Sequence, residues 1–530
     1  MKNRIPSILL ALMMSSLLFA NNVTVTNITL TGQNTSSDYT TVQFDLSWEN
    51  SWRDPVNYDA VWIFVKYQVG NGEWNHALLN TTSGNHSVGS ENGVSSEIEV
   101  GTTSGNGIGV FLKRSANGTG NINWDNVQLR WEYGSNGVAD DDLVTVKVFA
   151  IEMVYVPTAS FYVGSGGGET SAFHAGGTTD PYQITSEGDI TVSNLSSSDL
   201  YYDGDGDQTG PVPANFPKGY AAFYCMKYEV SQEQYVDFLN CLNYDQQERR
   251  TRTVPSSTAD NGVMGSEVPS TNTPYVSPIG IETAGTNNST PAVYVNNFDG
   301  DTNYDESNDG ATKACAFLYW HDAMAYLDWA GLRPMTELEF EKACRGDQSP
   351  IADEYAWGNP NVHTSDYSIG NEGTSTEVPA SPSTGTTGNA NNAFSNHTGY
   401  NDGIDPGGET PLRCGIFATS TSSRIEAGAS HYGIMEMSGN LTEPSISVGH
   451  SDGRSYTGVH GDGSLDTNGD ADVTNWPVNN GISLRGGGMH NSYLKITVSD
   501  RTYGAESVDS PGSISTEDSN NGARGVRTAN

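Results

Sequence analysis

The sequence predicts an α+β protein made of short strands and long loops. An N-terminal antiparallel β-sandwich is expected over residues 21–148, and a second domain with few helices over residues 149–530. Length supports two or three domains, because 530 residues exceed what one core organises. Sixty Gly and a charged fraction of only 17% are typical of short strands joined by many turns.

Period-two alternation of apolar residues predicts the sandwich. About seven short runs of this kind, separated by turn residues, describe two packed antiparallel sheets of the immunoglobulin or fibronectin type. No catalytic cluster lies in this region, so we expect a spacer or binding module. Examples of the runs are Val23-Val25, Val42-Phe44-Leu46-Trp48 and Val61-Ile63-Val65-Tyr67.

Helical patterns are confined to the second domain. Ser231 with Gln234, and Thr336 with Glu339, form capping boxes that open two helices, and a third helix is expected over about 320–330. Glu337, Glu339 and Glu341 alternate at a helix start, where they suit the helix dipole better than acid-base chemistry. Three polar inserts, near 165–213, 245–312 and 364–411, are each expected to bury little apolar surface by themselves.

The first twenty residues have the pattern of a signal peptide. A basic start ending at Arg4 precedes an uncharged apolar run over residues 5–19, and Ala20 closes it. A membrane span needs about 20 apolar residues, so residues 1–20 predict export rather than anchoring. We expect a secreted protein, extracellular or at the cell surface, with no membrane span.

Net charge narrows the classes of partner. With 25 Lys plus Arg and 63 Asp plus Glu, the charge is −38. Nucleic acids and anionic membranes need a basic face, so neither is expected as a partner. The charge favours metal cations, and a plain solubilising surface explains it equally well.

Five cysteines are present, and an exported chain is expected to pair some of them. The odd number leaves at least one thiol over, and the connectivity is open. They are Cys225, Cys241, Cys315, Cys344 and Cys414.

Seven ordered segments of the second domain resemble the formylglycine-generating enzyme, or sulfatase-modifying factor, family. The resemblance implies a variant of the C-type-lectin fold and covers residues 150–530 apart from the inserts. The segments are 153–157 (MVYVP), 223–240 (with YEV and FLN), 331–341 (GLRPMTELEFE), 355–359 (YAWGN), 432–443 (YGIMEMSGNLTE), 484–488 (LRGGG) and 525–527 (GVR).

The resemblance also implies chemistry that this chain lacks. The family enzyme is a copper-dependent oxidase that holds the metal between two thiolates, and soft sulfur ligands select cuprous copper. Those positions fall near Asn491 and Ile496, and no Cys follows Cys414. We therefore do not expect copper.

Calcium is the metal that the resemblance does imply here. The family's structural ion would be held by the side chains of Glu436 and Glu443 and by the carbonyls of Gly439 and Leu441. Hard oxygen donors around a turn suit calcium, and the competing interpretation is two ordinary solvated carboxylates. The Trp of the family signature is replaced by Thr442.

Two acidic runs have the alternating spacing that begins a calcium loop. Each lacks the distal Glu of a complete loop, so a plain polar turn is an equal alternative. The first is Asp203-Asp205-Asp207, and the second is Asp466, Asn468, Asp470 and Asp472.

We expect a secreted, non-catalytic binding or structural protein with calcium as a structural ion. Its ligand would be an extracellular protein or glycan, bound by loops over 476–489 and 490–518. The alternative is a metal-dependent oxidoreductase of the same superfamily with an altered active site, using groups such as His490, Asp500 or Tyr503. A matrix component that self-associates through the sandwich is a third possibility.

Overall fold

The computed structural model describes most of the chain. The described residues are 23–258, 262–265, 277–286, 289–301, 303–393, 410–507 and 519–529. The predicted signal peptide lies outside these ranges. Within them, no helix has the length and apolar character that a membrane crossing requires.

One antiparallel sheet in the N-terminal region has the order β1-β2-β8-β5. In β2 the apolar residues Val42, Phe44, Leu46 and Trp48 are buried, and the polar residues between them are partly exposed. The predicted period-two alternation is therefore confirmed here. The strands are β1 (Thr24–Asn34), β2 (Tyr39–Arg53), β5 (Ser87–Ser90) and β8 (Gly118–Trp131).

A second, eight-stranded sheet crosses the boundary expected between residues 148 and 149. Its order is β17-β23-β14-β9-β3-β7-β6, with β4 paired to β3. Val148 pairs with Val65 and Phe149 with Phe64, so β9 passes through that boundary without interruption. The strands are β3 (Asp59–Val69), β4 (Trp74–His76), β6 (Ser96–Thr103), β7 (Asn106–Arg114), β9 (Val144–Val156), β14 (Phe223–Met226), β17 (Arg333–Pro334) and β23 (Gly525–Thr528).

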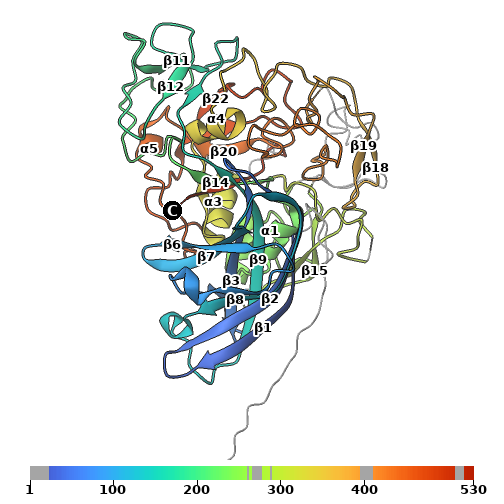
Figure 1. The fold of residues 1–530 in the computed structure, drawn as a ribbon. Helices are drawn as coiled ribbons and strands as arrows, with labels where there is room; N and C mark the ends of the chain where they lie inside the picture. The colour runs from blue at the N-terminus through green and yellow to red at the C-terminus, as the bar shows by residue number, and fades with distance from the viewer. Residues whose placement is uncertain are drawn as a thin grey trace, which may run out of the picture.

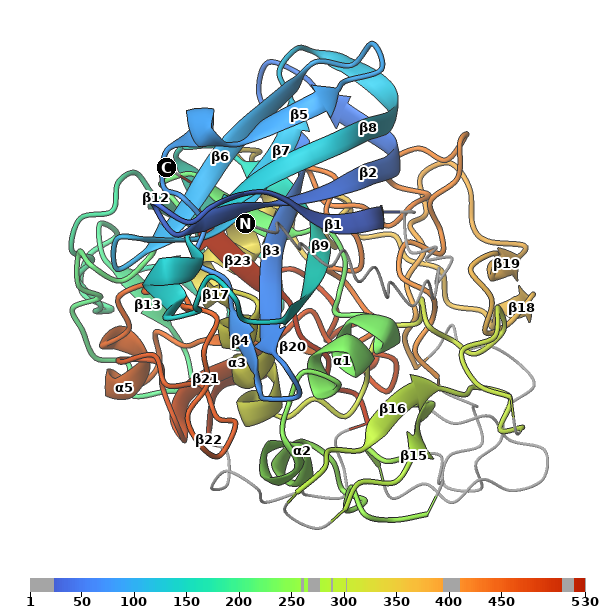
Figure 2. The ribbon, with the colours of Figure 1, turned by 90° about the horizontal axis from the view of Figure 1, so that it is seen from below.

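Strand β3 holds the two parts of the molecule together. Val61, Ile63 and Val65 join an apolar cluster with β2 and β8, while Trp62 and Phe64 join a second cluster with the helices. A strand buried on both faces is expected to be continuously apolar, as residues 60–65 are. In Figure 2 this strand lies between the N-terminal sheet and the helices.

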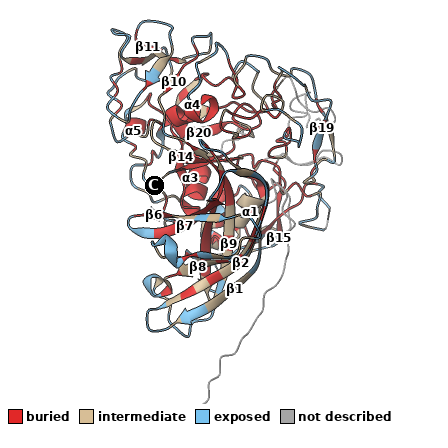
Figure 3. Ribbon diagram, viewed as in Figure 1, coloured by how far each residue is buried: buried red, intermediate tan, exposed pale blue. Residues whose placement is uncertain are grey.

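Five helices lie in the second part of the chain that the structure describes. The capping boxes at Ser231 and Thr336 are both present, as predicted. Figure 3 shows that α3 and α4 are buried almost throughout. The helices are α1 (Gln232–Leu239), α2 (Tyr244–Arg250), α3 (Trp320–Trp329), α4 (Glu337–Arg345) and α5 (Ser451–Arg454).

The remaining strands form small sheets around this core (Figure 1). Antiparallel pairs are β10-β12, β11-β13, β15-β16 and β18-β19, and β20-β21-β22 form a three-stranded sheet. Their bounds are β10 (Phe161–Val163), β11 (Phe173–Ala175), β12 (Tyr182–Ile184), β13 (Leu200–Tyr202), β15 (Ile279–Thr283), β16 (Val293–Asn296), β18 (Ser368–Gly370), β19 (Val378–Ala380), β20 (Glu443–Ile446), β21 (Asn480–Arg485) and β22 (Tyr503–Ser507).

The inserts bury apolar side chains through contacts with neighbouring elements and not by themselves. The first insert buries Phe173, Leu200 and Tyr202, because these side chains join the main apolar cluster that neighbouring elements complete. The second insert includes most of α2 and the β15-β16 hairpin. The expectation that some of the cysteines form disulfides was wrong, since all five are buried free thiols within apolar surroundings.

Candidate functional site

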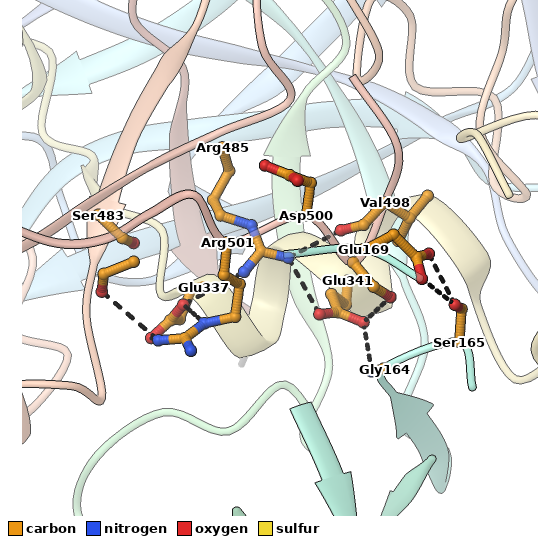
Figure 4. A network of polar contacts seen from close by, with 12 residues as sticks. Gly164, Ser165, Glu169, Glu337, Glu341, Ser483, Arg485, Val498, Asp500 and Arg501 are labelled. Atoms are coloured by element: carbon orange, nitrogen blue, oxygen red, sulfur yellow. Dashed lines mark hydrogen bonds and ion pairs between the residues drawn. The ribbon is translucent and has the colours of Figure 1, made fainter. Parts of the chain in front are cut away.

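Helix α4 carries three buried glutamates, and each binds at least one arginine from outside the helix. Glu337 accepts hydrogen bonds from Arg501 Nε at 2.6 Å and from Arg485 Nη1 at 3.2 Å. Glu341 accepts from the second amino group of Arg485 at 3.0 Å. One turn of helix separates the two glutamates, so they face the same strand end (Figure 4).

The third glutamate of α4 has its own partner. Glu339 pairs with Arg333 of β17 through two hydrogen bonds of 2.6 and 2.8 Å. Both side chains are at most 2% exposed. Besides lying at a helix start, each of the three acids neutralises a buried guanidinium. This network joins two of the family-like segments, 331–341 and 484–488, and fixes their relative positions.

A second group of buried acids surrounds Arg524, and it contains the predicted calcium ligands. Glu443 accepts from Arg524 Nε at 2.7 Å, and the other guanidinium nitrogens donate to the carbonyls of Met226 and Met435. Glu436 accepts from the backbone N–H of Gly415 at 2.7 Å.

Glu229 is the third acid of this group, and hydrogen bonds hold it against the turn that carries the other two. It accepts from the backbone N–H of Leu441 at 2.9 Å and also from the Asn440 side chain. Gly439 and Asn440 have positive φ angles of 86° and 67°, which bend the chain around these carboxylates. The group Glu229, Glu436, Glu443 and Arg524 is called the Arg524 cluster below.

The Arg524 cluster has more acid than base. Burial raises the pKa of Glu436 to about 7, and it raises the pKa of Glu229 well above its usual range. The pKa of Glu443 is also raised by burial, although Arg524 opposes the change. One oxygen of Glu436 and one of Glu443 are buried without a hydrogen-bond partner. Unpartnered buried carboxylate oxygens are the donor type that calcium takes, so the residues present fit that ion.

A small cavity borders the Arg524 cluster. Glu436, Ser438 and Asn440 line it from one side, and Asn391 and Arg413 from another. Asn440 is held by the backbone N–H of Leu412, which donates to its side-chain oxygen at 2.9 Å. Glu436, one oxygen of which has no hydrogen-bond partner, thus borders a small space that Leu412, Ile416 and Phe417 also line.

The resemblance places the family's thiolates near Asn491 and Ile496, and the structure gives each of these residues its own contacts. Ile496 is fully buried in an apolar cluster with Tyr355 and Trp357. The Asn491 side-chain oxygen accepts from the Gly488 N–H at 2.9 Å and from the Asn520 amide at 2.8 Å. Neither environment supplies a soft ligand.

The groups suggested for an altered oxidoreductase each have a separate partner. His490 lies 3.0 Å from the Ser519 hydroxyl, and Tyr503 accepts from Lys495 Nζ at 2.9 Å. Asp500 accepts from the backbone N–H of Thr502 at 3.1 Å. Among the described residues, neither His490 nor Asp500 joins a group of ligand side chains close enough to share an ion.

The structure separates the acidic run over 466–472. Asp470 pairs with Arg249 and Arg250, and Asp466 accepts from the N–H groups of Asn468 and Asp470 within its own turn. Asp472 instead lies with Asp328 and Asp462, close enough for one ion to reach all three. The four predicted residues do not converge on one centre.

The shorter run over 203–207 also diverges. Asp207 makes two hydrogen bonds of 2.8 Å to Arg454, and Asp205 accepts from the Ser171 hydroxyl at 3.0 Å. Asp203 is exposed beside His174, 3.6 Å away. The contact of Asp207 with Arg454 joins the first insert to α5, and the other two contacts lie within the insert.

Sequence reasoning missed several members of these groups. Glu229 lies in the YEV segment and Arg524 directly precedes the closing GVR segment, so both lay next to motifs that had been recognised. A third acidic group, formed by Asp299, Asp301 and Glu306, follows β16 within the second insert. Its signal was the alternation of acids in residues 299–306.

No curated protein matches the chain. A family model described as the sulfatase-modifying factor enzyme 1-like domain matches residues 150–512, which is more than half of the chain. The matched range contains every element of the α4 network and all three acids of the Arg524 cluster. The chain therefore belongs to the sulfatase-modifying factor family.

Proposed function

We propose that the protein is a secreted, non-catalytic binding or structural member of its family, stabilised by calcium at the Arg524 cluster. The observation that carries the proposal is the occupation of the two thiolate positions. Ile496 is packed in an apolar cluster, and Asn491 is engaged by amide and backbone donors. A copper oxidase of this family needs sulfur at both places, and neither residue can be a soft ligand.

The charge balance of the Arg524 cluster supports calcium. Three carboxylates face one guanidinium, and two carboxylate oxygens have no partner. Glu436 and Glu443 would supply side-chain oxygens to the ion, and Gly439 and Leu441 would supply carbonyls. A divalent cation would compensate the excess negative charge that the protein leaves in this buried place.

We infer that the two sheets of the N-terminal region form a β-sandwich and that the family domain has a C-type-lectin-like fold. The apolar cluster shared by β2, β3 and β8 supports the first inference. For ligand binding, the exposed side chains of Val478, Tyr493 and Leu494 lie in the two loop regions expected to recognise a partner. An extracellular protein or glycan is the proposed class of ligand.

Metal analysis of the purified protein separates this proposal from the oxidoreductase alternative. We expect calcium in stoichiometric amount, and no conversion of a peptide thiol to an aldehyde. Stoichiometric copper or iron, together with such turnover, would favour the enzyme and overturn the proposal.

Glu443→Gln tests the calcium site itself. In the wild type, calcium at about 100 times its Kd should stabilise the fold by about 2.7 kcal/mol, seen as a rise in Tm. The variant should lose this calcium-dependent rise, because it removes one charged ligand. Thermal unfolding with calcium and with a chelator measures both.

Glu339→Gln is the matched control for that experiment. It also disrupts a buried glutamate-arginine pair, with Arg333, but none of its oxygens is orphaned. The control should therefore lose stability and keep the full response to calcium. If both variants keep the response, or both lose it, calcium does not bind at Glu443.

A further inference from the structure

An open groove of about 580 Å³ lies where the N-terminal region meets the family domain. One wall is the hairpin tip between β2 and β3, with Arg53, Asp54 and Val56, and another is the chain that leaves β9, with Pro157 and Thr158. Only the second of these walls lies inside the family match over 150–512, so neither part of the chain forms the groove alone. Ligand sites have volumes of about 300–1,000 Å³ and are common at junctions between domains, so this groove has the size and place of a binding site.

Two tyrosines line the groove, and ring contacts hold them in place. The ring centroids of Tyr58 and Tyr155 are 4.6 Å apart, and the two ring planes differ by only 5°. The guanidinium of Arg53 lies 4.6 Å from the centre of the Tyr58 ring and donates to Glu97 at 3.0 Å. The Tyr58 hydroxyl lies 3.2 Å from that of Tyr224. Side chains that are fixed before a ligand arrives lose little entropy when it binds.

The hairpin tip that forms the first wall is also fixed. One carboxylate oxygen of Asp54 accepts from the backbone N–H groups of Val56 at 2.6 Å and of Asn57 at 2.8 Å. The Asn57 side chain donates to the carbonyl of Tyr432 at 2.8 Å, which ties the tip to the family domain. Among the described residues, no group donates to the other oxygen of Asp54. That oxygen is therefore available to a ligand.

Other polar groups around the groove are available as well. The side chains of Asn117 and Thr158 are exposed, and neither makes a hydrogen bond within the part of the chain that the structure describes. The same holds for the Tyr155 hydroxyl. Amide and hydroxyl groups both donate and accept hydrogen bonds, and the carboxylate of Asp54 accepts them. A ligand with several hydroxyl groups, each of which also donates and accepts, matches this set.

Charge indicates that the ligand is neutral. Arg53 brings a positive charge to the groove and Asp54 a negative one, so the groove has no single sign of charge to attract an ion. The chain as a whole carries −38, which repels an anionic polysaccharide. A wholly apolar ligand would displace water from these polar groups without replacing its hydrogen bonds, which costs affinity.

We propose that this groove, called the Tyr155 groove below, binds a neutral oligosaccharide. Asp54, Asn117 and Thr158 would bond the sugar hydroxyls, and Tyr155 and Pro157 would contact the apolar parts of the sugar rings. The inference rests on the proposed binding role and names one class of ligand for it. Its site is separate from the loops over 476–489 and 490–518, and it does not depend on calcium.

An array of neutral hexasaccharides tests the Tyr155 groove in the full chain. The probes are hexamers of glucose, mannose, galactose and N-acetylglucosamine, with hexagalacturonic acid as the anionic comparison. We expect binding to at least one neutral hexamer and none to the anionic one. If no neutral hexamer binds, the proposal is overturned, whereas the calcium and metal measurements on the proposed function are unaffected.

Asn117→Ala/Thr158→Ala locates the bound sugar. Calorimetric titration with the hexamer that binds most tightly should show an affinity lower by about tenfold or more, because two hydrogen bonds to the ligand are lost. The matched control Thr191→Ala/Asn194→Ala makes the same changes at exposed residues of the first insert and should bind as the wild type does. Equal affinity in the wild type and the groove variant would overturn the proposal.

Tyr493→Ala/Leu494→Ala separates the Tyr155 groove from the loops of the proposed function. This variant should keep the wild-type affinity for the hexamer. If it loses binding while the groove variant keeps it, the groove assignment fails and the recognition loops stand. Hydrogen exchange in the wild type decides the matter if a variant does not fold. Bound sugar should slow exchange in peptides over 53–58 and 155–160, and slowing confined to 476–507 would overturn the proposal.

Discussion

The α4 network and the Arg524 cluster are both groups of buried glutamates, and they differ in charge balance. In the α4 network each glutamate meets at least one guanidinium, and Arg485 serves two of them. In the Arg524 cluster three carboxylates lie around one guanidinium, which donates to Glu443, and one oxygen of Glu436 and one of Glu443 have no partner. The comparison teaches that a paired buried acid is part of the scaffold, whereas an acid left short of partners marks a place for a ligand.

The largest expected effect comes from breaking the balanced group. Glu337→Ala would leave Arg485 and Arg501 buried without one of their carboxylate partners, and the cost is about 3–5 kcal/mol of unfolding free energy. Urea unfolding at neutral pH measures this loss. Calcium should not restore it, and recovery with calcium would erase the distinction between the two groups.

A second variant removes the only guanidinium of the unbalanced group. Arg524→Gln should destabilise the chelated protein by about 3 kcal/mol, since it leaves buried acids unpaired. Calcium should recover part of this loss, and its stabilising effect should exceed that in the wild type. Arg485→Gln is the matched comparison and should show no such recovery. Equal calcium effects in both variants would contradict the interpretation.

Asp322 provides an intermediate case, because it shares Arg250 with Asp470. Burial raises its pKa to about 6 in spite of that arginine, from an ordinary value of 3.8. The folded state therefore holds this proton more tightly than the unfolded state. Its contribution to stability is complete below about pH 3.8 and falls by about 1.4 kcal/mol per pH unit until about pH 6.

The variant Asp322→Asn isolates that contribution. The difference in unfolding free energy between wild type and variant should fall as pH rises from about 4 to about 6 and stay level above it. Denaturant unfolding at several pH values measures the difference. A difference that does not vary with pH would show that Arg250 compensates Asp322 fully.

Local sequence patterns determined much of the secondary structure and the family. The alternation in β2 and the capping boxes at Ser231 and Thr336 each report on contacts within a few residues, so they could be read directly. The seven family-like segments identified the family that the match over 150–512 shows. In β3 the residues between Val61, Ile63 and Val65 are apolar as well. This continuous apolar run is the sequence pattern from which burial of both strand faces could have been predicted.

The tertiary structure decided which acidic side chains lie close together in space. Glu229 and Glu443 both interact electrostatically with Arg524, although more than two hundred residues separate the two glutamates in the sequence. The run over 466–472 diverges, because Arg249 and Arg250 of α2 attract Asp470 while Asp472 lies beside Asp328. Spacing fixes only neighbours along the chain, whereas charge balance depends on every segment that packs around a buried group.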